Sequence, residues 1–384
     1  MRKIVVSLYY INYIIVMVVV LILPALADVQ NPKELELLMQ TYTDNKYYNC
    51  VCWLTSHNSY AHRRDNTGLI KNIYYINPNQ ILDIKEQLEF GVRGFMIDLY
   101  YELDKNQDKT NRINMAHATN EHSSLHFYEQ PLAPFLKTIK EWLDSHPNDI
   151  ITLHLESYIR NYGLLVKNLK DAGLYELLFN FDSEAKWPTL GWMRKNNKRL
   201  VIFSDKFEDA GYGIMYVSDT METEYDIGEF PNCEKRSEGR AKKSPIFIVN
   251  HFYKFSIIPG ATKTIATVRS IRSIIDKTVD LTLINQNQYQ NLVRRAGICF
   301  FQEGQWPNFM AVDFIGAING GERKITLDIN SNNCCCLEAN EDNSKIVKEH
   351  ISQDYYNDYW WQNPTGTQCL PINNTNQNQH KTGN

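Results

Sequence analysis

Ionisable and amide side chains follow several short apolar runs of the sequence. One run ends in Ser56-His57-Asn58-Ser59-Tyr60, a second reaches Asp98, a third reaches His117, and a fourth ends in His154-Leu155-Glu156. Two imidazoles that titrate near neutral pH suit a reaction that needs both a base and an acid. A lone histidine or acid at a strand end is more often a structural group or a helix cap. The interpretation therefore depends on all of them meeting at one edge of the fold.

These polar groups follow β-rich runs that alternate with segments of helical spacing, at 134–145 and 164–179. The runs cover residues 50–57, 92–100, 113–117, 150–156, 200–204, 246–251 and 309–314. The alternation is typical of a parallel sheet with crossover helices. Seven such strands, with no Pro/Gly/Ser-rich linker between them, predict an α/β fold with one distorted TIM-type (β/α) barrel. No eighth strand is evident, and 208–243 reads as a long charged excursion. Active sites of such barrels lie at the carboxyl ends of the strands.

The first 27 residues have the pattern of a signal peptide. Arg2 and Lys3 precede an apolar run at 14–23, and Ala25-Leu26-Ala27 supplies a small-residue cleavage signal. We therefore expect secretion or delivery to the endomembrane lumen. An uncleaved membrane anchor is the alternative, because the stretch 8–27 approaches the length of a bilayer span.

Composition limits the rest of the chain. With 40 Lys and Arg against 44 Asp and Glu, and 43% hydrophobic residues, the protein is globular and lacks the positive field of a nucleic-acid binder. We expect a signal peptide at 1–27, a barrel domain at 28–328, and a cysteine-containing extension with an Asn/Gln-rich tail at 329–384.

Eight cysteines are present, an even number that permits four disulfides in an oxidising compartment. They are Cys50, Cys52, Cys233, Cys299, Cys334, Cys335, Cys336 and Cys369. No pair has the C-x-x-C spacing of a zinc site. We therefore predict disulfides and leave their pairing open.

The motifs together resemble a known family. Ser-His-Asn-Ser-Tyr at 56–60, Gly91-Val92-Arg93 followed by Asp98, then His117 and Leu155-Glu156-Ser157 are similar to the X domain of phosphatidylinositol-specific phospholipase C. The resemblance is to its secreted, single-domain phosphodiesterase members. It continues through later motifs and covers roughly residues 48 to 322.

The resemblance implies a mechanism. The histidine that matches His57 accepts the proton of the inositol 2-hydroxyl, which attacks its own phosphodiester, and the one that matches His117 protonates the departing glycerol oxygen. The product is a cyclic inositol phosphate that water then opens. Asp313 could orient His57 as the carboxylate of a triad does; capping a helix or satisfying the core is an equal alternative for Asp313.

The resemblance also bears on substrate and metal binding. Lys206, Asn250 and His251 are candidates for contacts with the inositol hydroxyls. Metal-dependent members hold Ca²⁺ with an Asn, a Glu-x-Asp pair and a later Glu, all oxygen donors. The matching residues are Asn58, Asp98 and Glu156.

One residue departs from this metal pattern. Met96 stands where the first carboxylate of the Glu-x-Asp pair is expected, and a thioether is a poor ligand for Ca²⁺. This leaves a weaker site with three protein ligands, or a site that works without metal. Arg93 lies an odd number of residues before Asp98, on the opposite face of a strand, so we interpret it as structural.

We therefore predict a phosphoric diester hydrolase that acts on an inositol phospholipid, or a glycosylated relative, at a membrane surface. One alternative is a phosphodiesterase for a different phospholipid head group, although such enzymes generally need the carboxylate that Met96 replaces. A second alternative is a non-catalytic protein that binds a lipid head group. Two histidines favour the enzyme, since a binding protein needs neither an acid nor a base. The sequence leaves the oligomeric state open.

Overall fold

The computed structural model describes most of the region between residues 32 and 331. The described residues are 32–62, 79–104, 106, 108–118, 126–180, 186–206, 213–225, 232–236, 240–253, 287–317 and 320–331. The predicted signal peptide at 1–27 lies outside the described residues, and so does the tail after 331.

Parallel strands form one curved sheet, which confirms the predicted fold class. Their order is β7-β6-β5-β2-β1-β10-β9-β8, and each neighbouring pair is parallel. Their bounds are β1 Trp53–Ser56, β2 Gly94–Leu103, β5 Ile151–Ser157, β6 Leu200–Ser204, β7 Met215–Tyr216, β8 Met221–Glu222, β9 Phe247–His251 and β10 Phe309–Val312. β7 and β8 end this order on opposite sides, yet only the short turn η5 (Val217–Asp219) and Thr220 separate them. A link of that length keeps the two sheet edges close, so the sheet curls into a nearly closed barrel.

The prediction of a long excursion at 208–243 is wrong. In its described part this segment holds β7 and β8, which complete the sheet at both ends. Each strand has only two residues, too few to show the alternation of side chains by which strands are recognised in a sequence. For this reason no eighth strand was evident.

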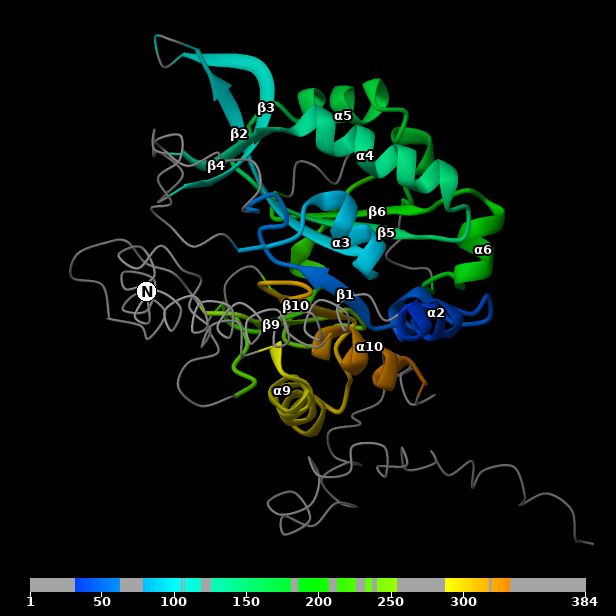
Figure 1. Ribbon diagram of the computed structural model, residues 1–384. Coiled ribbons are helices and arrows are strands. Elements are labelled where there is room, and N and C mark those ends of the chain that lie inside the picture. Colours follow the sequence, from blue (N-terminus) through cyan, green and yellow to red (C-terminus); the bar gives the residue numbers. More distant parts are fainter. Residues whose placement is uncertain are drawn as a thin grey trace, which may run out of the picture.

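The predicted strand at 113–117 exists but does not belong to the barrel. It lies within β3 (Lys109–Ala118), which pairs antiparallel with β2 and with β4 (His126–Pro131). Only five residues connect β2 to β3, whereas a parallel connection needs a dozen or more. The Asp104 carboxylate tightens this turn by accepting the backbone N–H groups of Asn106 and Asp108. β2, β3 and β4 reach beyond the rest of the sheet, at the upper left of Figure 1.

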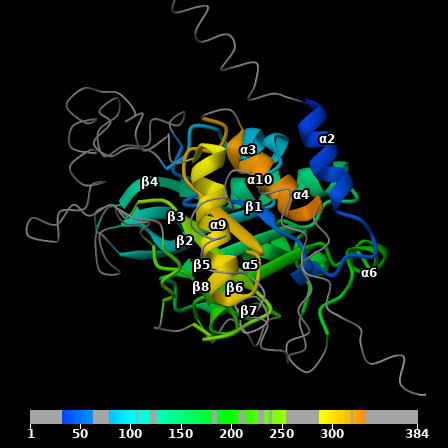
Figure 2. The ribbon, with the colours of Figure 1, turned by 90° about the horizontal axis from the view of Figure 1, so that it is seen from below.

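Helices cover the outside of the barrel. They are α2 Pro32–Thr41, α3 Ile84–Phe90, α4 Leu132–Ser145, α5 Tyr162–Asp171, α6 Leu190–Lys195, α9 Tyr289–Glu303 and α10 Gly321–Ser331, with 3-10 turns η1 Tyr48–Cys50 and η3 Tyr175–Leu177. α4 and α5 lie on one side of the strands, and α9 and α10 on the other (Figures 1 and 2). The predicted helix at 134–145 is confirmed by α4. The one at 164–179 is shorter than predicted because the chain turns at Gly173, where φ is +70°.

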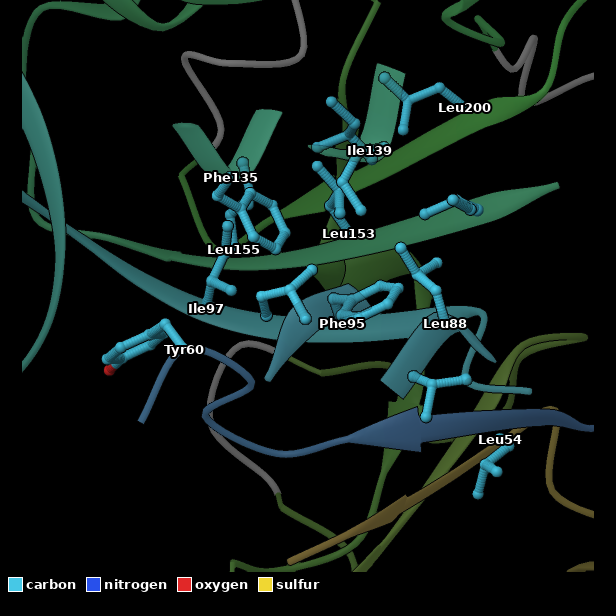
Figure 3. Close-up of a cluster of buried hydrophobic side chains, with 14 of the residues drawn as sticks. Leu54, Tyr60, Leu88, Phe95, Ile97, Phe135, Ile139, Leu153, Leu155 and Leu200 are labelled. Atoms are coloured by element: carbon cyan, nitrogen blue, oxygen red, sulfur yellow. The ribbon is translucent and has the colours of Figure 1, made fainter. Parts of the chain in front are cut away.

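Apolar side chains fill the layer between helices and sheet. Phe135 and Ile139 of α4 lie over Ile97 of β2 and over Leu153 and Leu155 of β5 (Figure 3). Since side chains alternate along a strand, the residues between these face the inside of the barrel. The helix layer therefore fixes which polar side chains point inward.

A second apolar cluster fills the barrel where its strands begin. Trp53 opposes Phe309 in the register of β1 and β10, and both are buried. The ring of Tyr48 lies 4.9 Å from that of Trp187, and Tyr42 stacks 4.9 Å from Trp53. These rings fill the inside of the barrel at its amino end.

A disulfide joins Cys233 to Cys299 of α9, which confirms disulfide formation at these two positions. Cys50 is disulfide-bonded as well. The cysteines at 334, 335, 336 and 369 lie outside the described residues. The domain boundary expected after 328 falls inside α10, whose Asn330 side chain bonds both backbone groups of Cys52 at 2.8 and 2.9 Å.

Candidate active site at the mouth of the barrel

The mouth of the barrel is the carboxyl end of its parallel strands, where His57, Asp98, Glu156, Phe252 and Asp313 stand. His57 directly follows β1 and Asp313 directly follows β10. These strands pair in register from Trp53–Phe309 to Ser56–Val312. The next residue of each strand therefore falls side by side on the inner face.

His57 is held by a carboxylate and by an aromatic ring. Its Nδ1 lies 2.8 Å from Asp313 Oδ1, and its ring stacks on Phe252 with centroids 3.6 Å apart. With Nδ1 engaged by the carboxylate, the second nitrogen, Nε2, is left for a substrate proton. The structure thus brings together the two residues that the sequence analysis associates. Their catalytic role stays a prediction.

Asn79 belongs to this group, although the sequence analysis missed it. Its Nδ2 donates to both carboxylate oxygens of Asp313, at 3.1 and 3.2 Å, and lies 3.4 Å from His57 Nδ1. Its Oδ1 accepts from Asn58 Nδ2 at 3.4 Å. Asn79 precedes α3 in a loop without periodicity, and no motif marks it.

His117 reaches the mouth along an unexpected route. It does not end a barrel strand; the hairpin of β2 and β3 folds it back beside Asp98. His117 Nδ1 lies 3.7 Å from Asp98 Oδ2 and 3.2 Å from Asn58 Nδ2. Burial lowers the pKa of His117, but the adjacent Asp98 and then Glu156 outweigh burial and raise it above its usual value. A pair of asparagines, Asn58 and Asn79, therefore links the surroundings of the two histidines.

Two carboxylates lie side by side at the mouth. Asp98 of β2 opposes Glu156 of β5 in the sheet register. Burial, followed by the charge of Asp98, raises the pKa of Glu156 to about 7. Tyr60 donates a hydrogen bond to Asp98 at 3.1 Å, and Tyr158 donates one to Glu156. Such a pair either shares a proton or attracts a cation.

The oxygen donors fit a Ca²⁺ ion only in part. Asp98 and Glu156 are adjacent. The Nδ2 of Asn58 faces Asn79 and His117, so its Oδ1 is the atom that could serve as a ligand for a cation. Met96 packs with Phe252 and Ala311 and contributes no oxygen. Within the described ranges, no group of three or more His, Cys, Asp and Glu side chains could hold a metal. The donor set therefore consists of two carboxylates and one amide oxygen.

The structure separates the three residues expected to contact the inositol ring. Lys206 stands at the mouth, with Nζ 3.2 Å from Asp205 Oδ2 and 5.7 Å from the centre of the Tyr158 ring. Asn250 is fully buried and donates to Glu222 at 2.9 Å, one layer below the mouth. His251 is buried on the outer face of β9. Of the three, only Lys206 stands at the opening.

Two further residues, one on a barrel strand and one just before a barrel strand, are buried away from the mouth. His154 lies inside the barrel between Phe203 and Phe309, and burial lowers its pKa to about 3, so it is neutral. Arg93 is buried at the opposite end from the mouth and forms an ion pair with Asp149 at 2.8 Å. The structural interpretation of Arg93 is confirmed.

Comparison with known proteins assigns the chain to a family. A family model, PI-PLC X, matches residues 45–328. A PI-PLC X domain-containing protein of Arabidopsis thaliana is 25% identical over 287 residues, covering 71% of this chain and 60% of the relative. PI-PLC X domain-containing protein 1 of Arthroderma benhamiae is 30% identical over 187 residues, covering 45% of this chain and 57% of the relative. The chain spans between 57% and 62% of the length of these and one further curated relative.

Among solved structures, phosphatidylinositol-specific phospholipase C from Listeria monocytogenes is similar with a TM-score of 0.47 and 13% identity, covering 76% of this chain and 97% of that one. The sequence match is more informative than the structural one, because it takes in every strand of the barrel and ends within α10. By that match, the chain is a member of the PI-PLC X family.

Proposed function

We propose that this protein is a phosphoric diester hydrolase that cleaves an inositol phospholipid or a glycosylated relative. The observation that carries the proposal is the pairing of His57 with Asp313, in a mouth that also holds His117 beside Asp98. One histidine is oriented as a base, and the other has a raised pKa that favours its protonated form, which suits an acid.

In the first step, His57 Nε2 takes the proton of the inositol 2-hydroxyl while that oxygen bonds to phosphorus. The bond from phosphorus to the glycerol oxygen breaks, and protonated His117 gives its proton to that oxygen. A cyclic phosphate and a diacylglycerol result. In the second step water attacks phosphorus, with His117 now as the base and His57 returning its proton to the 2-oxygen. Since the first attack is intramolecular, positioning supplies much of the rate.

The negative charge of the phosphate needs a positive partner at this acidic mouth. Ca²⁺ bound by Asn58, Asp98 and Glu156 would supply it by acting on the phosphate oxygens. With Met96 in place of a carboxylate, we expect weak binding of this ion. Activity that is lost in chelator and restored by Ca²⁺ supports the site, and full activity in excess chelator rules it out.

We further propose that the protein enters the secretory pathway. A relative from Arthroderma benhamiae, 26% identical over 304 residues, carries the name "Uncharacterized secreted protein". No helix in the described part of the chain is long and apolar enough to cross a bilayer. Amino-terminal sequencing of the protein from culture medium is expected to begin at Asp28; an intact Met1 would contradict cleavage.

The head group is tested with a panel of lipids in mixed micelles. We expect water-soluble phosphate to be released from phosphatidylinositol or its glycosylated form, and not from phosphatidylcholine or sphingomyelin. Release of phosphate from a choline lipid would favour the alternative of a phosphodiesterase that acts on a different head group. Binding of inositol phosphate without release from any lipid would favour the non-catalytic protein, an alternative that Met96 keeps open.

A further inference from the structure

A second group of charges lies inside the barrel below the mouth, beside β8 and β9. Glu222 at the end of β8 is 1% exposed, and its Oε2 lies 2.5 Å from Arg240 Nε and 3.6 Å from Arg236 Nη1. Its Oε1 accepts from Asn250 Nδ2 at 2.9 Å. One buried carboxylate with two guanidinium groups leaves this cluster with one positive charge in excess.

The two arginines are not equivalent. The side chain of Arg240 is 9% exposed and that of Arg236 is 24% exposed. Nη1 of Arg236 is buried toward Glu222, so the exposed part of the group lies beyond that atom. The carboxylate of Glu222 already contacts Arg240 and Asn250. The positive charge that Glu222 does not neutralise is therefore that of Arg236, the more exposed of the two arginines.

A row of rings places Arg236 relative to His57. The guanidinium carbon lies 3.8 Å from the centre of the Tyr225 ring, Tyr225 is 6.0 Å from Phe252, and Phe252 stacks on His57. Arg236 and Glu156 also interact electrostatically, each favouring the charged form of the other. The cation thus lies on the wall of the mouth that continues from the base His57.

The segment that carries Arg236 is firmly attached. Cys233 is bonded to Cys299 of α9, and Lys235 forms an ion pair with Glu303 of the same helix at 2.7 Å. Arg236 itself donates its backbone N–H to the backbone carbonyl of Glu222 at 2.9 Å. A guanidinium held over an aromatic ring in this way is preorganised to bind oxyanions through its N–H groups.

From this geometry we infer that Arg236 is a substrate-binding residue that holds a phosphate oxygen of the inositol head group. This inference rests on the proposed function. The phosphate is either the reacting phosphodiester or a second phosphate on the ring. No role for Arg236 follows from the sequence motifs, because it lies in a segment without periodicity, eleven residues after Tyr225.

The test compares Arg236→Met, which removes the charge and keeps much of the volume, with Arg236→Lys and the control Lys137→Met. Lys137 is an exposed cation on α4, so the control lowers the net charge equally. Calorimetric titration with inositol monophosphate and inositol bisphosphate measures affinity without turnover. We expect Arg236→Met to weaken binding about tenfold or more, with partial recovery in Arg236→Lys and no change in Lys137→Met.

The two ligands separate the sources of the phosphate. Equal weakening for both assigns Arg236 to the reacting phosphate, and weakening of the bisphosphate alone assigns it to a second phosphate. Unchanged affinity for both in a variant with unchanged melting temperature overturns the inference. Because binding is read without catalysis, a wild-type protein that binds these ligands but cleaves no lipid contradicts the proposed function and leaves this inference testable.

Discussion

The two ends of the barrel are made by the same strands with opposite kinds of side chain. Along β1 the inward residues change from Trp53 to His57, and along β10 from Phe309 to Asp313, four residues apart in each case. The amino end is packed with rings, whereas the mouth holds ionisable groups joined by hydrogen bonds. One set of strands thus serves packing at one end and chemistry at the other.

The difference between the ends has an energetic meaning. Burial of large rings at the amino end stabilises the fold. At the mouth, burial of the carboxylates, followed by their mutual repulsion, carries a cost, as the raised pKa of Glu156 shows. Changes at the mouth should therefore alter activity with little loss of stability. Changes at the amino end should do the reverse.

The largest expected effect is on turnover. His57→Ala or His117→Ala should lower kcat by about 10²–10⁴-fold, because each removes a proton-transfer group. The melting temperature should stay close to that of the wild type. His146→Ala, at the end of α4 on the outside of the barrel, is the matched control and should retain full activity. An equal loss of kcat in all three variants would contradict the assignment of catalysis to the mouth.

A large effect on stability is expected at the closed end. Trp53→Ala should lower the free energy of unfolding by about 3–5 kcal/mol, since it leaves a cavity among buried rings. The kcat of the remaining folded protein should be within about twofold of the wild type, because the mutation spares the acid and the base. Denaturant titration measures the loss, and Trp192→Ala at a 47% exposed position should have little effect.

A smaller effect on activity is expected for the residue that orients the base. Asp313→Asn should lower kcat, but by less than His57→Ala does, because the base stays in place and loses only the partner that fixes its tautomer and orientation. It should leave binding of inositol phosphate nearly unchanged, which distinguishes positioning from substrate contact. An equal rise in KM and fall in kcat would argue that Asp313 touches the substrate instead.

The smallest expected effect concerns Glu322, a buried carboxylate in α10 outside the mouth. Burial raises its pKa from 4.5 to about 7, although the backbone N–H of Gly316 donates to it at 2.6 Å. The folded protein thus binds this proton more tightly than the unfolded chain does. The resulting stability is complete below about pH 4.5 and is lost as the pH rises to about 7.

Glu322→Gln should remove this part of the pH dependence and make the protein more stable than the wild type above pH 7, by on the order of 1 kcal/mol. Thermal unfolding of both proteins across the pH range measures the difference. Parallel curves would show that Glu322 ionises alike in the folded and unfolded states.

Much of the barrel is predictable from sequence because its main strands are long enough to show a pattern. β1, β2, β5, β6, β9 and β10 all fall in apolar runs. The two-residue strands β7 and β8 are defined by their pairing with β6 and β9, and no local sequence pattern reveals them. The direction of β3 was not predictable, because the two apolar runs end at 100 and begin again at 113, and the residues between them leave room for a crossover. Both strands extend beyond these runs, and the structure leaves only a short hairpin link between Leu103 and Lys109.

The site shows the same division. His57 and Asp313 follow adjacent strands, so their meeting could be expected. Asn79 and Arg236 lie in irregular segments, and their positions depend on contacts far away in the sequence, such as the bond from Asn79 to Asp313. Asn250 and His251 also end a strand, but Asn250 lies below the mouth, held by Glu222, and alternation turns His251 outward.

In the proposed mechanism, two histidines cleave a phosphodiester through a cyclic intermediate. Phosphorus NMR of the mature protein mixed with phosphatidylinositol, with and without Ca²⁺, tests this most directly. We predict a signal of cyclic inositol phosphate that precedes inositol phosphate and is absent with His57→Ala. Direct appearance of inositol phosphate, or a cyclic product that persists in His57→Ala, would contradict the mechanism.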